Sequence, residues 1–562
     1  MSETAPSLSL SVASSMISTS NGAVGGPFAL FKAMPEYNRG NRLYDVGRYE
    51  AAFAHYDGAV QFKPDWFSAW LRRGNTLRKL KRHKEALASY DRAIKLKPTH
   101  YWGWTFRGIV LAKLERYHEA IASFDKAIKI NPDNFEAWYE RGLALEATIQ
   151  FEAAAASYKR AIEIQPDASS AWYHQGNALM NEERYADAVE AYHRAVQLQP
   201  TNYEAWFNLG EMLMNQYRYP EALGSYDQAL RLQPKSHQAW FNRGIVLQKL
   251  HRYSEAVESY ETVIQLQPQD YEAWFYKSIA LKPLRPEAAL AAIDQALQLH
   301  PEAPAMWISR GQILTDLKDY GSAIAAFDKA TQLNANFPEA WLGRGKALCH
   351  LGQCPSAVIA YDNALQIQPD FLEAWIQRGI ALEKLNRYTE AVTAYDKVLL
   401  LTASNQVAAT TAGLQRGAAL EKLQRYPEAI VAYRRVVQDR PDFFEAWIQL
   451  GQVLEKVEQY SEAFDAYEQA RDLWPDNYPV ALKCGQMLEQ AQRQSEAIKL
   501  YDSVIQRSPG YYEAWLHRGR AFEQLNCYQE ALSSYGVALE LKPGSKAIIA
   551  QRNRLMMKLG NV

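Results

Sequence analysis

Apolar and small residues recur along this chain with a period of 34 residues. Within one repeat, positions 4, 8 and 11 have the spacing of one helix face, and positions 20, 24 and 27 have the spacing of a second. Proline at position 32 ends the second segment, because a proline ring cannot continue a helix. Each repeat is therefore predicted to be a hairpin of two helices, helix A followed by helix B.

Individual positions keep this register along the chain. Fifteen units cover residues 33–545, and the second unit reads FSAWLRRGNTLRKLKRHKEALASYDRAIKLKPTH. Position 8 is Gly in fourteen units, with Ser278 as the exception, and position 20 is Ala in all fifteen. Position 24 is Tyr or Phe in all but one, which has Ile293. We predict that the two helices approach most closely at the glycine of position 8 and the alanine of position 20.

Tryptophan marks position 4. Twelve of the fifteen tryptophans fall there: Trp70, Trp104, Trp138, Trp172, Trp206, Trp240, Trp274, Trp307, Trp341, Trp375, Trp447 and Trp515. An aromatic residue that recurs in register indicates architecture before it indicates a ligand site. We interpret these tryptophans as packing residues.

The pattern resembles that of the tetratricopeptide repeat (TPR) family, W-x2-L-G-x2-Y…A-x3-F…P. Position 7 here is usually Arg rather than Leu, and position 11 is Leu rather than Tyr. The dense Trp, Gly and Pro regularity looks like the long bacterial arrays of this family, including cyanobacterial ones. The resemblance implies an all-α fold, a right-handed α-α superhelical solenoid of fifteen TPR hairpins. In such a fold each hairpin buries its apolar face against the next.

Three segments follow from the alignment. Residues 1–32 are expected to be a flexible Ser-rich segment, residues 33–545 to form the TPR units, and residues 546–562 to form a C-terminal capping helix. Residues 1–27 contain no Lys or Arg, so neither a secretory signal nor a transit peptide is indicated.

The period breaks at two places. Unit eight is one residue short and carries Ser278, Pro283 and Pro286. Unit eleven carries about four extra residues, and Gly413 then stands where Trp belongs. We expect a break between subarrays near residues 400–412. The alternative is a simple loop insertion.

Positions 25 and 7 change together along the array. Where position 25 is acidic, position 7 of the next unit is basic, except where Glu468 is followed by Cys484. Where position 25 is Lys159, His193 or Arg434, the next position 7 is uncharged. We predict ion pairs that join helix B of one unit to helix A of the next, and such pairing argues against a phosphate-binding arginine row. The pairs are Asp57–Arg73, Asp91–Arg107, Asp125–Arg141, Asp227–Arg243, Glu261–Lys277, Asp294–Arg310, Asp328–Arg344, Asp362–Arg378, Asp396–Arg416 and Asp502–Arg518.

Composition narrows the function. Among 562 residues, 62 Lys and Arg oppose 63 Asp and Glu, so no global charge directs the chain to nucleic acid or anionic lipid. Four cysteines suit a reducing compartment, and no apolar run reaches about 18 residues. We expect a cytoplasmic protein without a transmembrane segment.

Motifs of catalysis are missing from the sequence. There is no phosphate-binding Gly loop, no HExxH and no paired CxxC. Cys349, His350 and Cys354 lie close in sequence, but a structural zinc needs a fourth ligand. We therefore expect a protein that is not an enzyme, with no catalytic residues, no cofactor and no metal.

The remaining candidate for a functional site is the surface formed by the A helices. In this family helix A lines a concave groove, and positions 2, 5, 9, 12 and 13 face it. Position 5 is apolar or aromatic in all but one unit, and amides lie beside it. Such a surface suits an extended peptide or an amphipathic helix, since amides pair with its backbone while apolar pockets take its side chains. The alternative is that position 5 mainly packs against the neighbouring helix A. The predicted groove residues are Tyr139, Tyr173, Asn177, Phe207, Asn208, Phe241, Asn242 and Phe275.

The resemblance also excludes one kind of partner. Members that bind Hsp70 or Hsp90 tails clamp a carboxylate with Lys at position 5, and no unit here has it. That carboxylate clamp is not expected.

Unit two is electrically distinct, with ten basic residues against Glu85 and Asp91. Its predicted basic patch is Arg72, Arg78, Lys79, Lys81, Arg82 and Lys84. A solvated face would explain it, but it is also the basis of an alternative function, binding of a nucleic acid or an acidic ligand. Another alternative is a recognition arm for an enzyme on a separate chain. The preferred function is a scaffold that holds partner proteins in its groove.

Overall fold

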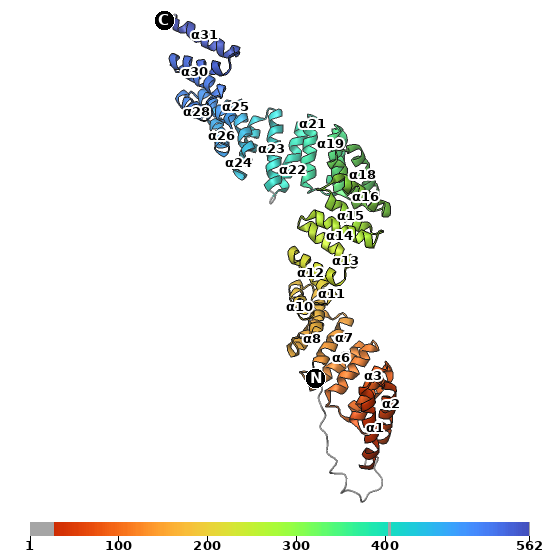
Figure 1. Cartoon of the computed structure of the whole chain (residues 1–562). Helices are drawn as coiled ribbons and strands as arrows, with labels where there is room; N and C mark the ends of the chain where they lie inside the picture. The colour runs from red at the N-terminus through yellow and green to blue at the C-terminus, as the bar shows by residue number, and fades with distance from the viewer. Residues whose placement is uncertain (1–26, 403–405, 561–562) are drawn as a thin grey trace. The chain divides into compact units, whose positions relative to one another are not determined.

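A computed structural model describes residues 27–402 and 406–560, in which 31 helices and no strand are formed (Figure 1). Successive helices pair as hairpins, and helix B of each hairpin packs on helix A of the next within each unit. The predicted all-α solenoid of helical hairpins is confirmed. The chain divides into two compact units, residues 1–268 and 269–562.

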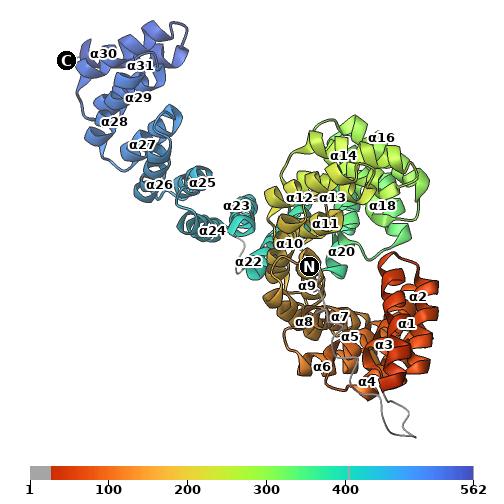
Figure 2. The same ribbon diagram turned by 60° about the horizontal axis from the view of Figure 1, so that its bottom comes forward.

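The first unit contains seven hairpins in its described residues, and Figure 2 shows them from a second direction. Its helices are α1 (Pro27–Asp45), α2 (Tyr49–Phe62), α3 (Phe67–Lys79), α4 (His83–Leu96), α5 (Tyr101–Lys113), α6 (Tyr117–Ile130), α7 (Phe135–Ala147), α8 (Phe151–Ile164), α9 (Ser169–Asn181), α10 (Tyr185–Leu198), α11 (Tyr203–Asn215), α12 (Tyr219–Leu232), α13 (His237–Lys249) and α14 (Tyr253–Leu266).

The second unit contains eight hairpins and one further helix in its described residues. Its helices are α15 (Tyr271–Leu281), α16 (Pro286–Leu299), α17 (Pro304–Asp316), α18 (Tyr320–Leu333), α19 (Pro338–His350), α20 (Cys354–Ile367), α21 (Leu372–Lys384), α22 (Tyr388–Leu401), α23 (Gln406–Lys422), α24 (Tyr426–Asp439), α25 (Phe444–Lys456), α26 (Tyr460–Leu473), α27 (Tyr478–Gln490), α28 (Gln494–Arg507), α29 (Tyr512–Gln524), α30 (Tyr528–Leu541) and α31 (Lys546–Gly560).

Each hairpin closes around an aromatic ring at position 24. A Cβ added to Gly74 would lie 2.6 Å from the ring of Tyr90, and Ala86 at position 20 is fully buried. The predicted close approach at the glycine of position 8 and the alanine of position 20 is therefore confirmed. The exception supports the same explanation, because Ser278 replaces Gly in the one unit where Ile293 replaces the aromatic ring.

The position-4 tryptophans tie each hairpin to the turn before it. The indole N–H of Trp70 donates to the carbonyl oxygen of Pro64 at 2.9 Å, and most other units repeat this bond. Trp341 makes it to Ala335, where the unit lacks its proline. The interpretation of these residues as architectural is confirmed.

The two irregular places differ in kind. α15 has 11 residues where most A helices have 13, and Pro286 begins α16. In unit twelve the extra residues lengthen helix A instead, since α23 has 17 residues. Residues 403–405 lie outside the described residues, and a subarray break near 400–412 stays a prediction.

The two ends bear on the expected segments. Residues 1–26 lie outside the described residues, and α1 begins at Pro27, ahead of residue 33. At the other end, α31 buries Ile548 and Leu555 in a cluster with Tyr535 of α30.

Candidate functional site

The predicted ion pairs form at nine junctions. The guanidinium Nε of each arginine lies 2.6–2.8 Å from an Asp oxygen: Arg73–Asp57, Arg107–Asp91, Arg141–Asp125, Arg243–Asp227, Arg310–Asp294, Arg344–Asp328, Arg378–Asp362, Arg416–Asp396 and Arg518–Asp502. The pair Glu261–Lys277 stays a prediction. At the junction that departs from the acidic–basic pattern, where Cys484 stands at position 7, Glu468 instead pairs with Arg471 of its own helix at 3.1 Å.

These arginines are also held by other groups. Arg243 is 17% exposed, donates to Ser259 Oγ at 2.7 Å, and lies 5.4 Å from the ring centroid of Trp240. A guanidinium already engaged by a carboxylate, a hydroxyl and an indole is poorly placed to bind phosphate. The arginine row is a structural element of the junctions.

The predicted aromatic groove residues occupy position 5 of consecutive A helices. In the first unit Tyr139, Tyr173, Phe207 and Phe241 lie half-buried on α7, α9, α11 and α13. Their rings pack against the buried position-24 tyrosine of their own hairpin, as Phe207 does on Tyr226 at 5.8 Å between centroids. Phe275 is likewise half-buried on α15 of the second unit. The four rings of the first unit thus brace their hairpins and keep part of their surface exposed.

The predicted amides belong to the same layer. Asn177 Oδ1 accepts a hydrogen bond from the hydroxyl of Tyr192 at 2.7 Å, and Asn208 Nδ2 donates to Asn177 Oδ1 at 3.2 Å. Asn242 Nδ2 donates to the hydroxyl of Tyr226 at 3.3 Å. An amide group has two donor hydrogens and an acceptor oxygen, so these bonds use only part of its capacity. The structure therefore brings Asn177 and Asn208 together and keeps Asn242 in the next repeat.

Position 12 carries a feature that the sequence reasoning missed. In five repeats of the compact unit 269–562, the hydroxyl of the position-24 tyrosine donates to a glutamate at position 12. Tyr395, for example, donates to Glu383 at 2.8 Å. The same bond recurs at Glu421, Glu455, Glu489 and Glu523. Glutamate at position 12 of five consecutive units was the signal that would have found this row.

These carboxylates are partly buried. Burial raises the pKa of the Glu383 carboxyl, and the hydrogen bond from Tyr395 opposes that rise. Glu421 pairs with Lys456 at 2.5 Å, and Glu455 pairs with Lys483 at 2.9 Å. The A-helix surface therefore carries amides in the compact unit that ends at residue 268. It carries carboxylates in the later repeats of the compact unit that begins at residue 269.

The basic patch of unit two splits into two sets. Lys79, Lys81, Arg82 and Lys84 are exposed around the turn between α3 and α4, and Arg82 is paired with Glu85 at 2.6 Å. Arg72 and Arg78 are half-buried on α3. Their guanidinium carbons lie over aromatic rings, 5.8 Å from that of Tyr44 and 5.1 Å from that of Phe106. Only the turn set is presented to solvent as a cluster.

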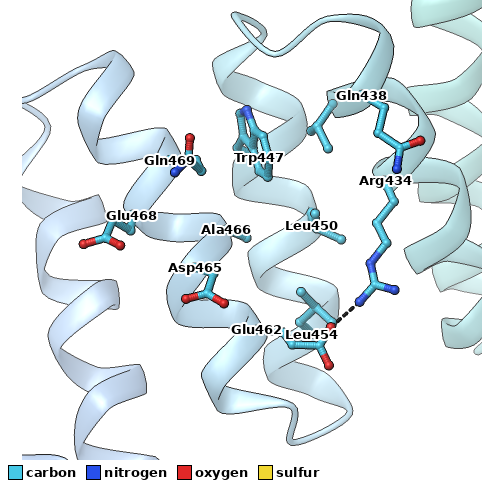
Figure 3. A pocket seen from close by; sticks show the side chains of 11 residues that line it. Arg434, Gln438, Trp447, Leu450, Leu454, Glu462, Asp465, Ala466, Glu468 and Gln469 are labelled. Carbon is cyan, nitrogen blue, oxygen red and sulfur yellow. Dashed lines mark hydrogen bonds and ion pairs between the residues drawn. The ribbon is translucent and has the colours of Figure 1, made fainter.

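Two of the pockets lie at junctions without the acidic–basic pair, and a third lies where tryptophan is missing. One of about 480 Å³ lies beside Leu450, which replaces the usual arginine, and Arg434 reaches across it to Glu462 (Figure 3). A second of about 580 Å³ lies at the junction of Lys159 and Gln175. A third of about 400 Å³ includes Gly413, which replaces tryptophan. These cavities arise from missing large side chains and are separate from the position-5 rings.

The described residues form neither a metal cluster nor a membrane-spanning helix. Within residues 27–402 and 406–560, no group of three or more His, Cys, Asp or Glu side chains is placed to hold a metal ion. In the same part of the chain, no helix combines the length and the apolar character needed to cross a bilayer.

Family comparison agrees with the repeat geometry. Tetratricopeptide repeat models match residues 107–171, 173–237, 279–340, 342–408, 414–478 and 482–546, and further models match 209–274 and 67–100. The chain belongs to the tetratricopeptide repeat family. Membership in it suggests a protein-interaction scaffold, a role that is generally non-catalytic.

Three solved structures are similar to this chain at low sequence identity. YrrB, "a TPR protein with an unusual peptide-binding site", is 24% identical over 33% of this chain and 95% of its own, with a TM-score of 0.31. The Naa15/Naa10 structure bound to HypK-THB is 13% identical over 94% of this chain and 97% of its own (TM-score 0.33). Yeast Tom70 is 16% identical over 79% and 97% (TM-score 0.36). No curated protein sequence matches this chain.

Proposed function

We propose that this chain is a non-enzymatic scaffold that binds peptides or helices of partner proteins on its A-helix surface. The observation that carries the proposal is the row of half-exposed rings at position 5, with Tyr139, Tyr173, Phe207 and Phe241 on consecutive A helices of one unit. Apolar side chains of a partner would pack on these rings, and its backbone would pair with Asn177, Asn208 and Asn242. Phe275, half-buried on α15, would offer a ring of the same kind in the unit that covers residues 269–562.

Rigidity supports this assignment. Each ring is held by a buried tyrosine, and the amides are oriented by that tyrosine's hydroxyl. A pre-organised surface loses little side-chain entropy on binding. Many shallow contacts along successive repeats would then add to a useful affinity.

The test is selection of peptides from a phage-displayed random library on the purified chain, followed by titration of the selected peptide. We expect Phe207→Ala/Phe241→Ala to weaken binding at least tenfold, with little change between low and high salt. The matched control is Leu198→Ala/Leu232→Ala, which truncates exposed apolar residues at the ends of helices B in neighbouring repeats. Circular dichroism checks that both variants remain folded. Equal binding by the two double variants would contradict the proposal.

The exposed turn of unit two supports a second candidate, binding of nucleic acid or another acidic ligand. Lys79, Lys81 and Lys84 lie exposed there. Binding through them would fall steeply with salt, because it would release condensed counterions. Labelled single-stranded DNA and polyglutamate are suitable probes. Binding of either that is lost in Lys79→Glu/Lys81→Glu/Lys84→Glu, but kept in Phe207→Ala/Phe241→Ala, would favour this candidate over the scaffold.

All four cysteines are free thiols, which supports a reducing compartment. We propose the cytoplasm as the site of action, which fractionation of cells expressing the tagged chain would test.

A further inference from the structure

Two of the free thiols lie against each other in the tenth repeat. Cys349 is in the last turn of α19 (labelled in Figure 1), and Cys354 is the first residue of α20 (labelled in Figure 2). Their Sγ atoms are 3.3 Å apart. A disulfide needs about 2.05 Å, so the two sulfurs have to close by little more than an ångström. Cys484 and Cys527, by contrast, have no cysteine neighbour among the described residues.

The turn between them can accommodate such a movement. It contains Gly352, whose φ is +76°, a value that glycine adopts without strain. A Cβ added at Gly352 would meet no atom within 4 Å, so this position of the turn has open space beside it. Bond formation would close a short loop from the end of helix A to the start of helix B.

The surroundings of the pair differ from those of the following repeats. Cys349 occupies position 12, where later repeats place a glutamate that accepts a hydrogen bond from the position-24 tyrosine. In the tenth repeat that tyrosine is Tyr361, which is fully buried and whose hydroxyl has no partner within the described part of the chain. Lys384 of α21 donates to Cys349 Sγ at 3.8 Å. The thiols therefore lie where later repeats place a carboxylate, next to the Lys384 ammonium.

We propose that Cys349 and Cys354 form a reversible disulfide that locks the tenth hairpin when the protein meets a hydroperoxide. Cys349 is half-exposed, whereas Cys354 is buried, so Cys349 is the thiol that the oxidant reaches first. Burial and the contact with Cys354 raise the pKa of the Cys349 thiol to about 11, and Lys384 opposes that rise, so oxidation should become faster as the pH rises. Cys354 then acts as the resolving thiol.

The hydroperoxide oxidises the two thiols to a disulfide in two steps. The Cys349 thiolate attacks one peroxide oxygen, an S–O bond forms as the O–O bond breaks, and the leaving oxygen takes up a proton as water or alcohol. The Cys354 sulfur then attacks Cys349 Sγ, an S–S bond forms as the S–O bond breaks, and hydroxide leaves with the thiol proton as water. The two sulfurs lose two electrons to the peroxide. A low-molecular-weight dithiol reverses the change.

The sequence makes the test direct. Trypsin cuts after Lys346 and Arg378, so one peptide carries both cysteines and neither of the other two. The full chain is treated with hydrogen peroxide, alkylated with N-ethylmaleimide and digested. We expect this peptide to change from two labels to none with the loss of two hydrogens, while the half-exposed Cys527 still labels. Dithiothreitol should restore both labels.

Two variants separate a disulfide from simple over-oxidation. Cys527→Ser should leave the change intact, and Cys354→Ser should abolish it, with Cys349 then gaining oxygen atoms instead. Hydrogen exchange at the turn between α19 and α20 should slow in the oxidised wild type and recover with dithiothreitol. The proposal is overturned if the 347–378 peptide keeps both labels while Cys527 is oxidised. It is also overturned if the peptide gains oxygen atoms equally in the wild type and in Cys354→Ser.

Discussion

The side chains at positions 25 and 7 show how one residue pair sets the spacing between hairpins. Asp227 and Arg243 belong to adjacent hairpins. Arg243 is largely shielded from water, with 17% of its side chain exposed, and Asp227 is partly shielded, with 41% exposed. Other junctions use leucine at position 7, as at Leu209 and Leu450, where the preceding position 25 is not acidic. An ion pair and an apolar leucine are thus alternative ways to fill the contact between neighbouring hairpins.

A double-mutant cycle at this junction tests that equivalence. We expect Arg243→Leu or Asp227→Leu alone to cost about 1–3 kcal/mol, because each leaves a half-buried charge without its partner. The double variant should cost less than the sum of the two. Urea denaturation of the four proteins measures this. Additive losses would show that the pair contributes no coupling.

At the scale of the element, the turn between helices A and B imposes its own requirement. Its middle residue has a positive φ in most hairpins, and within residues 27–402 and 406–560 only Gly47 and Gly352 meet this requirement with glycine. Ile149 holds a φ of +59° with 76% of its side chain exposed. A β-branched residue is strained there, and exposure leaves little packing to offset the strain.

Replacing that residue should therefore relieve strain. We expect Ile149→Gly to stabilise the hairpin of α7 and α8 by about 1 kcal/mol. The matched substitution, Gly352→Ala, should destabilise α19 and α20 by a similar amount for the opposite reason. Native-state hydrogen exchange of the two hairpins measures both effects. If exchange moved in the same direction in both variants, the turn conformation would not be the cause.

At the scale of the whole molecule, each hairpin is stabilised mainly by its immediate neighbours. Contacts between elements run overwhelmingly from one helix to the next, as expected for a solenoid. α31 covers the last hairpin with Ile548 and Leu555, both fully buried. Damage at this end should accordingly stay near it.

Leu555→Asp tests this locality, since it places a charge in a fully buried site. We expect faster hydrogen exchange in α29, α30 and α31, with α1–α14 unchanged. Met557→Asp serves as the control, because that side chain is 70% exposed and should change nothing. Faster exchange throughout the chain would instead mean that the array unfolds as one cooperative body.

The sequence by itself determined the repeat, the hairpins and the junction ion pairs. Fifteen copies in one chain can be compared with each other, and residues that touch, such as Asp227 and Arg243, change together along the array. It also placed the position-5 rings and their neighbouring amides on the A helices, although their role in binding is a proposal. Local periodicity suffices for these features because each one is defined within a hairpin or between neighbours.

Only the tertiary structure decided how the side chains share their partners. The bonds from Tyr395 to Glu383 and from Tyr192 to Asn177 depend on how far each side chain reaches across its hairpin. The pairing of Cys349 with Cys354 depends likewise on the path of one turn, since a separation of five residues fits many distances between two sulfurs. Sequence spacing fixes which helix face a residue occupies, whereas contacts between side chains are settled by distances in space.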